Sequence, residues 1–132
     1  MSNKISYKSF ENIPKHSLVA PDTNSNEVKL ATSGTDLIMG VSDDVDTTKN
    51  NPVDVQHYGI AKVVCGGNVK TGEAFTSDDK GRAIKAKTGD NIGGIMLEDG
   101  SEGEVCYCNI VIQRAIADAP SNATPSTPPT QV

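Results

Sequence analysis

The stretch that decides the fold runs from Val53 to Ile84 and reads VDVQHYGIAKVVCGGNVKTGEAFTSDDKGRAI. It contains two runs rich in β-branched residues, Val53–Gln56 and Ile60–Cys65, and Arg82–Ala86 follows a turn. Glycines mark the turns between these runs, and apolar residues do not recur with a helical period. Short strands joined by glycine-rich turns are typical of small barrels and sandwiches, so the sequence predicts an all-β domain.

Further strand patterns lie on both sides of this stretch, at Leu18–Ala20, Glu27–Ala31, Asp36–Val41, Ile92–Glu98 and Glu104–Arg114. The last run is the longest. One of its faces is apolar (Cys106, Cys108, Ile110, Ile112) and the other is mixed (Val105, Tyr107, Asn109, Val111, Gln113). Such a strand fits a barrel wall that also contacts something outside, which could be another copy of the protein. A sandwich strand covered by a loop fits it equally well.

We expect three parts: an extended N-terminal arm over residues 1–14, a barrel or sandwich of short antiparallel strands over residues 15–116, and a disordered tail over residues 117–132. The tail is rich in Pro and Thr and offers too little apolar surface to offset the entropy of ordering. In the arm, Ile5 and Tyr7 alternate with polar residues, which fits an edge strand, a segment that orders against a partner, or a disordered terminus. We expect the barrel to fold without Ser2–Phe10.

The composition narrows the function classes. The chain has 132 residues and a net charge of −5, and its Lys and Arg residues are scattered. Nucleic-acid binding depends on neutralising phosphates, so we expect no direct contact with DNA or RNA. The first residues lack the apolar core of a signal peptide, and no apolar run is long enough to span a bilayer. We therefore expect synthesis in the cytoplasm and no membrane partner.

The residues that could carry chemistry are few. Cys65, Cys106 and Cys108 are the three cysteines, and His16 and His57 are the two histidines. Structural metal sites usually need four ligands at characteristic spacings, so we expect no metal and interpret the cysteines as small, reduced, buried residues. Phosphate-binding loops of the GxxxxGK[ST] or GxGxxG type and the GxSxG elbow are missing. The sequence predicts a protein that is not an enzyme and has no cofactor.

Several motifs together carry a resemblance. A Gly40-Val41 step precedes a polar loop; then come VxVQxxGIAKV, VxxGExxTSDxxGRAIxA, a GGIxLE strand and a closing strand that begins with Gly-Glu. Between Val28 and Ile112 the chain resembles the small capsid cement, or head-decoration, proteins of tailed bacteriophages. The residues that carry the resemblance are Gly40, Val41, Val55, Gln56, Gly59, Ala61, Val63, Gly72, Thr76, Ser77, Asp78, Gly81, Arg82, Ala83, Gly94, Gly103 and Glu104.

The resemblance implies a structural role on a virion. The protein would bind the outer surface of an expanded phage head as a homotrimer and stabilise contacts between capsomers of the major capsid protein. Candidate capsid contacts are Ile5, Tyr7 and Phe10, and candidate trimer contacts are Tyr107 and Val111. An alternative of another class is a surface-displayed β module that binds a glycan or a host receptor, although such sites usually present aromatic platforms and this chain is poor in aromatic residues.

Overall fold

The computed structural model describes residues 3–115, which form ten β-strands and no helix, so the all-β prediction is confirmed. The strands are β1 (Lys4–Ser9), β2 (Leu18–Pro21), β3 (Glu27–Leu30), β4 (Gly40–Ser42), β5 (Pro52–Gln56), β6 (Gly59–Val64), β7 (Ala74–Ser77), β8 (Ala83–Lys85), β9 (Ile92–Met96) and β10 (Val105–Gln113). The tail expected over residues 117–132 lies outside the described residues.

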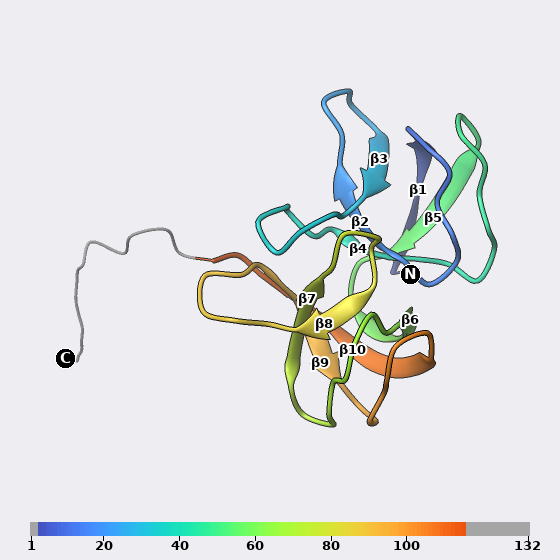
Figure 1. Cartoon of the computed structure of the whole chain (residues 1–132). Coiled ribbons are helices and arrows are strands. Elements are labelled where there is room, and N and C mark those ends of the chain that lie inside the picture. Colours follow the sequence, from blue (N-terminus) through green and yellow to red (C-terminus); the bar gives the residue numbers. More distant parts are fainter. Residues whose placement is uncertain (1–2, 116–132) are drawn as a thin grey trace.

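The strands form two bodies that follow one another along the chain. The first is a closed barrel with the order β1-β3-β2-β4-β5, and the second is a five-stranded sheet with the order β6-β10-β9-β7-β8. An isolated parallel bridge between Cys65 and Ala83 joins the two ends of the second sheet. In Figure 1 the first body lies above the second, with β2 and β4 close to the boundary.

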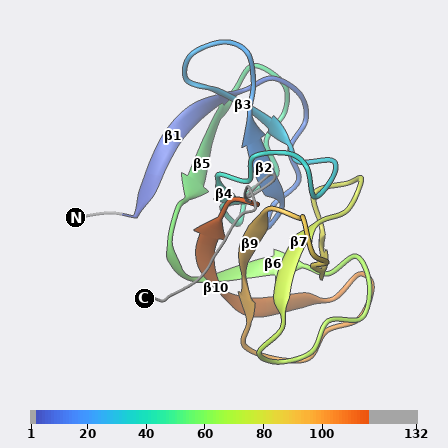
Figure 2. The ribbon, with the colours of Figure 1, turned by 90° about the vertical axis from the view of Figure 1, so that its left-hand side faces the viewer.

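The two bodies have the same topology, so the chain is a tandem structural repeat. In repeat 1 (residues 4–56) the first strand pairs in parallel with the third, and the ring continues antiparallel through the second, fourth and fifth strands. In repeat 2 (residues 59–113) Cys65, the residue after β6, bridges Ala83 of β8 in parallel, and β7, β9 and β10 continue the ring in the same order. Figure 2 shows the repeats from a second direction.

The correspondence extends to individual residue pairs. In repeat 1, Val19 pairs with Gly40 between β2 and β4; in repeat 2, Phe75 pairs with Gly94 between β7 and β9. The bridge from Ile13 to Thr47 has its counterpart in the bridge from Val69 to Gly100. Residues with positive φ also correspond, with His16, Asn26 and Asn50 matched by Gly72, Gly81 and Gly103. Both repeats therefore share these residue pairs and the positions of these positive-φ residues.

In each repeat a glycine of the fourth strand lies against the backbone of the fifth strand, at a position where no side chain fits. We call this position the crossing point. A Cβ on Gly40 would lie 2.1 Å from the carbonyl oxygen of Gln56, and a Cβ on Gly94 would lie 2.3 Å from that of Asn109. Gln56 and Asn109 occupy matching positions, because they pair with Val41 and Ile95 respectively. The fourth strand of each repeat can therefore approach the fifth closely only where its side chain is a hydrogen.

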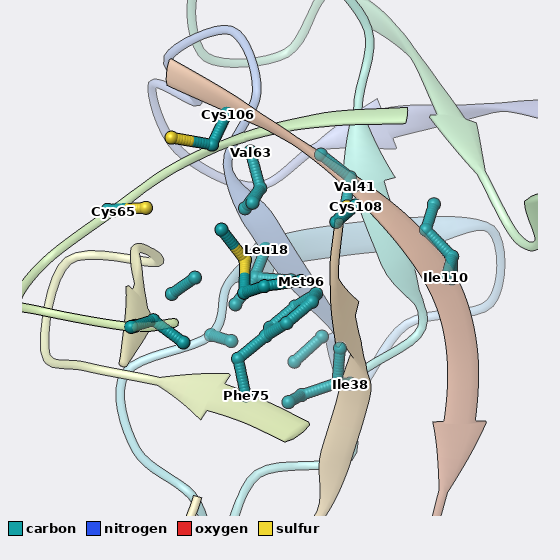
Figure 3. Packing of buried hydrophobic residues seen from close by; sticks show 14 residues of the cluster. Leu18, Ile38, Val41, Val63, Cys65, Phe75, Met96, Cys106, Cys108 and Ile110 are labelled. Atoms are coloured by element: carbon teal, nitrogen blue, oxygen red, sulfur yellow. The ribbon is translucent and has the colours of Figure 1, made fainter. Parts of the chain in front are cut away.

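Each repeat has its own apolar interior. Inside the barrel of repeat 1, the buried residues are Ile13, Val19, Val28, Val53 and Val55. The larger second cluster fills repeat 2 and also takes in Leu18, Ala20, Ala31, Ile38 and Val41 from repeat 1. Figure 3 shows Leu18 among Phe75 and Met96. The outward side chains of β2 and β4 thus pack into repeat 2, so the second cluster is shared by the two repeats.

The N-terminal segment is not a separate arm, which corrects the expected division at residue 14. β1 pairs with β5 from Lys4 to Lys8 and also with β3, so it is a wall of the closed barrel. The alternation of Ile5 and Tyr7 with polar residues is that of a strand in the barrel wall, in which Ile5 pairs with Val55 and Tyr7 pairs with Val53. Because β1 closes the barrel, we now expect the opposite of the sequence-based prediction, namely that the barrel is disrupted without Ser2–Phe10.

Two further expectations differ from the structure. The strands are not all antiparallel, because β1 and β3 run parallel. Asp36–Val41 was expected to be a buried strand or a single helical turn leading into one, and of this run only Gly40 and Val41 belong to β4, after a turn. The preceding turn is set by Asp36, whose carboxylate accepts hydrogen bonds from Thr32 N and Thr32 Oγ1 at 2.8 and 3.1 Å. Local side-chain hydrogen bonds of this kind compete with strand formation.

Candidate interaction surface

The strand β10 lies between β6 and β9 and carries the largest group of exposed apolar side chains on one sheet. Its outward residues alternate with the buried Cys106, Cys108 and Ile110. We define the outer face as the outward residues of β6, β9 and β10 together with Leu97, which follows β9. Its members are Ile60, Lys62, Val64, Ile95, Leu97, Val105, Tyr107, Asn109 and Val111.

The pairing register places these side chains side by side in rows. Asn109 pairs with Ile60 on one side and with Ile95 on the other. One row further along, Tyr107 pairs with Lys62, and the Leu97 N–H donates to the Tyr107 carbonyl at 3.1 Å. Neighbouring strands are about 4.8 Å apart, so side chains in one row are in contact distance.

The apolar members of the outer face are open to solvent. The exposed fractions are 59% for Ile60, 50% for Tyr107, 46% for Val105, 44% for Leu97 and 38% for Ile95. Contiguous apolar patches on a sheet are uncommon in proteins that function alone and usually mark contact surfaces. The outer face is therefore our candidate interaction surface.

The charges on this face are arranged around Tyr107. The Lys62 ammonium lies over the Tyr107 ring, 5.6 Å from its centroid, on the β6 side. On the β9 side, Glu98 Oε2 accepts a hydrogen bond of 2.7 Å from the Tyr107 backbone N–H. Tyr107 thus has Lys62 on its β6 side, and on its β9 side it has Glu98, whose carboxylate is hydrogen-bonded to the β10 backbone.

A hollow of about 200 Å³ borders the outer face where the two repeats meet. Its lining includes His16, Asp43, Asp44, Lys62 and Tyr107. Burial lowers the pKa of His16 below its ordinary value, and the nearby charge of Lys62 acts in the same direction. The hollow is small and open, and it extends the outer face toward repeat 1.

The structure places both candidate trimer contacts on the outer face. Tyr107 is half exposed at its centre, and Val111 is partly exposed toward its end. Sequence reasoning did not identify the β6 and β9 members of this face. Their exposure depends on which strands flank β10, and the sequence does not give the strand order.

The candidate capsid contacts occupy three different environments. Ile5 is 54% exposed. Tyr7 packs against the repeat 1 core, and its hydroxyl lies 2.9 Å from His57 Nε2. Phe10 is 45% exposed just beyond the other end of β1, with the Lys49 ammonium 5.9 Å from its ring centroid. Tyr7 is therefore a barrel residue, while Ile5 and Phe10 are open to solvent.

The cysteines are free and buried in the repeat 2 core, as expected from the sequence. Burial raises the pKa of Cys65 and of Cys108 to about 12, so both are thiols near neutral pH. Within residues 3–115, no three His, Cys, Asp or Glu side chains meet in a geometry suited to a metal ion. The same residues contain no helix that is long and apolar enough to span a membrane.

Comparison with known proteins gives one informative result. No protein-family model matches the chain, and neither does any curated protein. Among solved structures, the chain is similar to the N base of head fiber gp8.5 in bacteriophage phi29, with a TM-score of 0.69 and 21% sequence identity. The match covers 84% of this chain and 95% of that one. The two proteins therefore share a fold over nearly all of the phage domain.

Proposed function

We propose that this protein is a structural component of a phage virion that decorates the outer surface of the head. The observation that carries the proposal is the shared fold with the base of a phage head fiber over 84% of the chain. A fold alone does not determine function, so the proposal also draws on the motifs that resemble head-decoration proteins. The exposed apolar face on β6, β10 and β9 supports a role that depends on protein contacts.

In this proposal the protein binds the major capsid protein as a homotrimer and stabilises contacts between capsomers. A domain of this size offers a small area to each capsid subunit, and interfaces much below about 1,000 Å² are usually weak. Three joined copies engage several subunits at once, which raises avidity roughly 10²–10⁴-fold without stronger individual contacts. Ile5 and Phe10 are candidate contacts with the capsid because both are exposed, and Tyr7 supports β1 from inside the barrel.

The test is direct binding to heads. Purified protein is mixed with expanded phage heads that lack it, and the heads are imaged by electron cryo-microscopy. We expect regular density on the outer surface and a higher temperature of head disruption than in undecorated heads. Unexpanded heads are the control, and we expect them to bind less. Bare heads at saturating protein, together with binding to a glycan array, would instead support a receptor-binding module.

A further inference from the structure

The outer face differs from its counterpart in repeat 1, although the backbone is the same. Eight residues of the outer face have a counterpart in repeat 1, at the same place in the strand pairing. In repeat 2 these are Ile60, Lys62, Val64, Ile95, Leu97, Val105, Tyr107 and Asn109. In the same order, their counterparts in repeat 1 are Lys4, Ser6, Lys8, Val41, Asp43, Pro52, Asp54 and Gln56. Most of these are polar or charged, and Val41 is buried against repeat 2. The barrel therefore folds with a polar surface here, so the apolar side chains of repeat 2 are not a requirement of the fold.

One pair makes the contrast concrete. In repeat 1, Lys4 and Asp43 form a salt bridge of 2.9 Å across the β1-β5-β4 wall. The matching residues of repeat 2 are Ile60 and Leu97, which are 59% and 44% exposed. Leaving two large aliphatic side chains in water gives no folding benefit that a polar pair would not give. A partner that covers them removes apolar surface from water, which is favourable by roughly 25 cal/mol per Å².

The borders of the outer face carry opposite charges. Lys62 lies on the β6 side of Tyr107, beside a hollow that Asp43 and Asp44 also line, and Glu98 lies on its β9 side, bound to the Tyr107 backbone. Across residues 3–115 neither has an oppositely charged side chain within salt-bridge distance. A surface with a cation at one border and an anion at the other is complementary to a second copy of itself.

We propose that the outer face is the contact surface between copies of this chain, and that the Lys62 border of each copy meets the Glu98 border of the next around a three-fold axis. The inference rests on the proposed function, which requires a trimer, and it assigns that trimer to a surface. In a closed ring each contact joins two different borders, which suits opposite charges on opposite sides. The Tyr107 side chains then lie nearest the axis, where they are removed from water.

The first experiment replaces the outer face by its repeat 1 counterpart. The double variant Ile60→Lys with Leu97→Asp reproduces the pair that repeat 1 carries, and Tyr107→Asp reproduces Asp54. Because the same residues stand in a folded barrel in repeat 1, we expect both variants to keep the β-sheet circular dichroism spectrum. The wild-type protein should sediment near three times the chain mass of 13.9 kDa, and both variants near one chain mass.

The second experiment tests the charge pairing. Lys62→Glu and Glu98→Lys should each weaken trimer formation about 3–10-fold, because like charges then meet at every contact. Combining the two changes restores opposite charges and should recover most of the loss, except the part that comes from losing the hydrogen bond between the Tyr107 N–H and Glu98. The matched control is Ser6→Glu, which places the same charge at the repeat 1 position that corresponds to Lys62 and should leave the trimer unchanged.

The outcomes separate this inference from the proposed function. A wild-type protein that stays at one chain mass, or forms a dimer, overturns the three-fold contact even if heads are decorated. A trimer that persists in folded Tyr107→Asp and Ile60→Lys/Leu97→Asp proteins overturns the assignment to the outer face. A wild-type trimer that breaks as expected but does not bind heads leaves the contact surface standing and removes the function proposed above.

Discussion

Repeat 1 and repeat 2 share the order and direction of their strands but differ in their side chains. The core position occupied by Val19 in repeat 1 holds Phe75 in repeat 2, and the position of Val28 holds the smaller Ala83. One interior is lined mainly by valines and the other by Phe, Met and Cys, yet both pack around the same ladder. Interiors tolerate such exchanges when the total volume and the pattern are kept.

The comparison teaches which features the fold requires. Positions that agree in both repeats do so for backbone reasons: Gly40 and Gly94 where strands cross, and Asp36 and Asp90 in the turns before them. Positions on the outer surface are free to differ, because either polar or apolar residues complete the barrel. The apolar character of the outer face in repeat 2 is therefore not dictated by the fold.

The largest expected effect comes from removing β1. Deletion of residues 2–10 removes β1 from the closed barrel of repeat 1 and exposes the valine core inside it. We expect a loss of more than about 5 kcal/mol, which is the whole stability of many small domains. Urea unfolding followed by circular dichroism measures it. Deletion of residues 120–132 is the control and should leave the transition unchanged, whereas an intact cooperative transition without β1 would contradict the barrel assignment.

The two crossing glycines provide a matched pair of changes. Gly40→Ala and Gly94→Ala each place a Cβ within 2.3 Å of a backbone carbonyl, so the strands must separate. We expect a similar destabilisation in both, about 3 kcal/mol each, measured from urea midpoints. A clear difference between the two would show that the repeats do not share this constraint.

The control for the glycine pair is Gly67→Ala. A Cβ at Gly67 would have Ile84 Cγ2 at 3.7 Å as its nearest neighbour, which is an ordinary van der Waals contact. The cost should stay below about 1 kcal/mol. If Gly67→Ala were as destabilising as the other two, crowding at the strand crossing would not be the reason for their glycines.

The sequence predicted the individual strands better than their arrangement. Alternation located β6 and β10 to within about one residue, since each has one continuous apolar face. The strand β7 (Ala74–Ser77) was not predicted, because it is short and lies directly between two turn motifs. The alternation within β10 identified Tyr107 and Val111 as outward residues. The residues beside them on β6 and β9 could not be predicted, because they depend on which strands pair with β10.

The tandem repeat was not identified from the sequence for a specific reason. The residues that agree are few and isolated, such as Asn12 with Asn68 and Gly40 with Gly94. The spacing between matching residues is also not constant, because the turns within the two repeats differ in length by one residue at several places. A search for a fixed period therefore finds nothing, whereas the pairing register shows the repeat at once.

The smallest expected effect concerns the Lys4–Asp43 pair of repeat 1, which repeat 2 replaces with apolar residues. The hydrogen bond from Lys4 lowers the pKa of Asp43 below its ordinary value. A carboxylate with a lowered folded pKa stabilises the protein above its unfolded pKa, and this contribution is lost as the pH falls through the lower folded value. Asp43→Asn should therefore cost roughly 0.5 kcal/mol at pH 7, since both partners are partly exposed.

The pH dependence separates a charge effect from a packing effect. The difference in unfolding free energy between wild type and Asp43→Asn should shrink as the pH falls below about 4, where the carboxyl of the unfolded chain is protonated, and be lost as the pH passes the lowered folded pKa of Asp43. Lys4→Met should give a similar loss at pH 7, and the double variant should cost little more than either single change. A cost of Asp43→Asn that is the same at pH 7 and pH 3 would mean that the carboxylate contributes through its shape alone, and the polar surface of repeat 1 would then owe nothing to this ion pair.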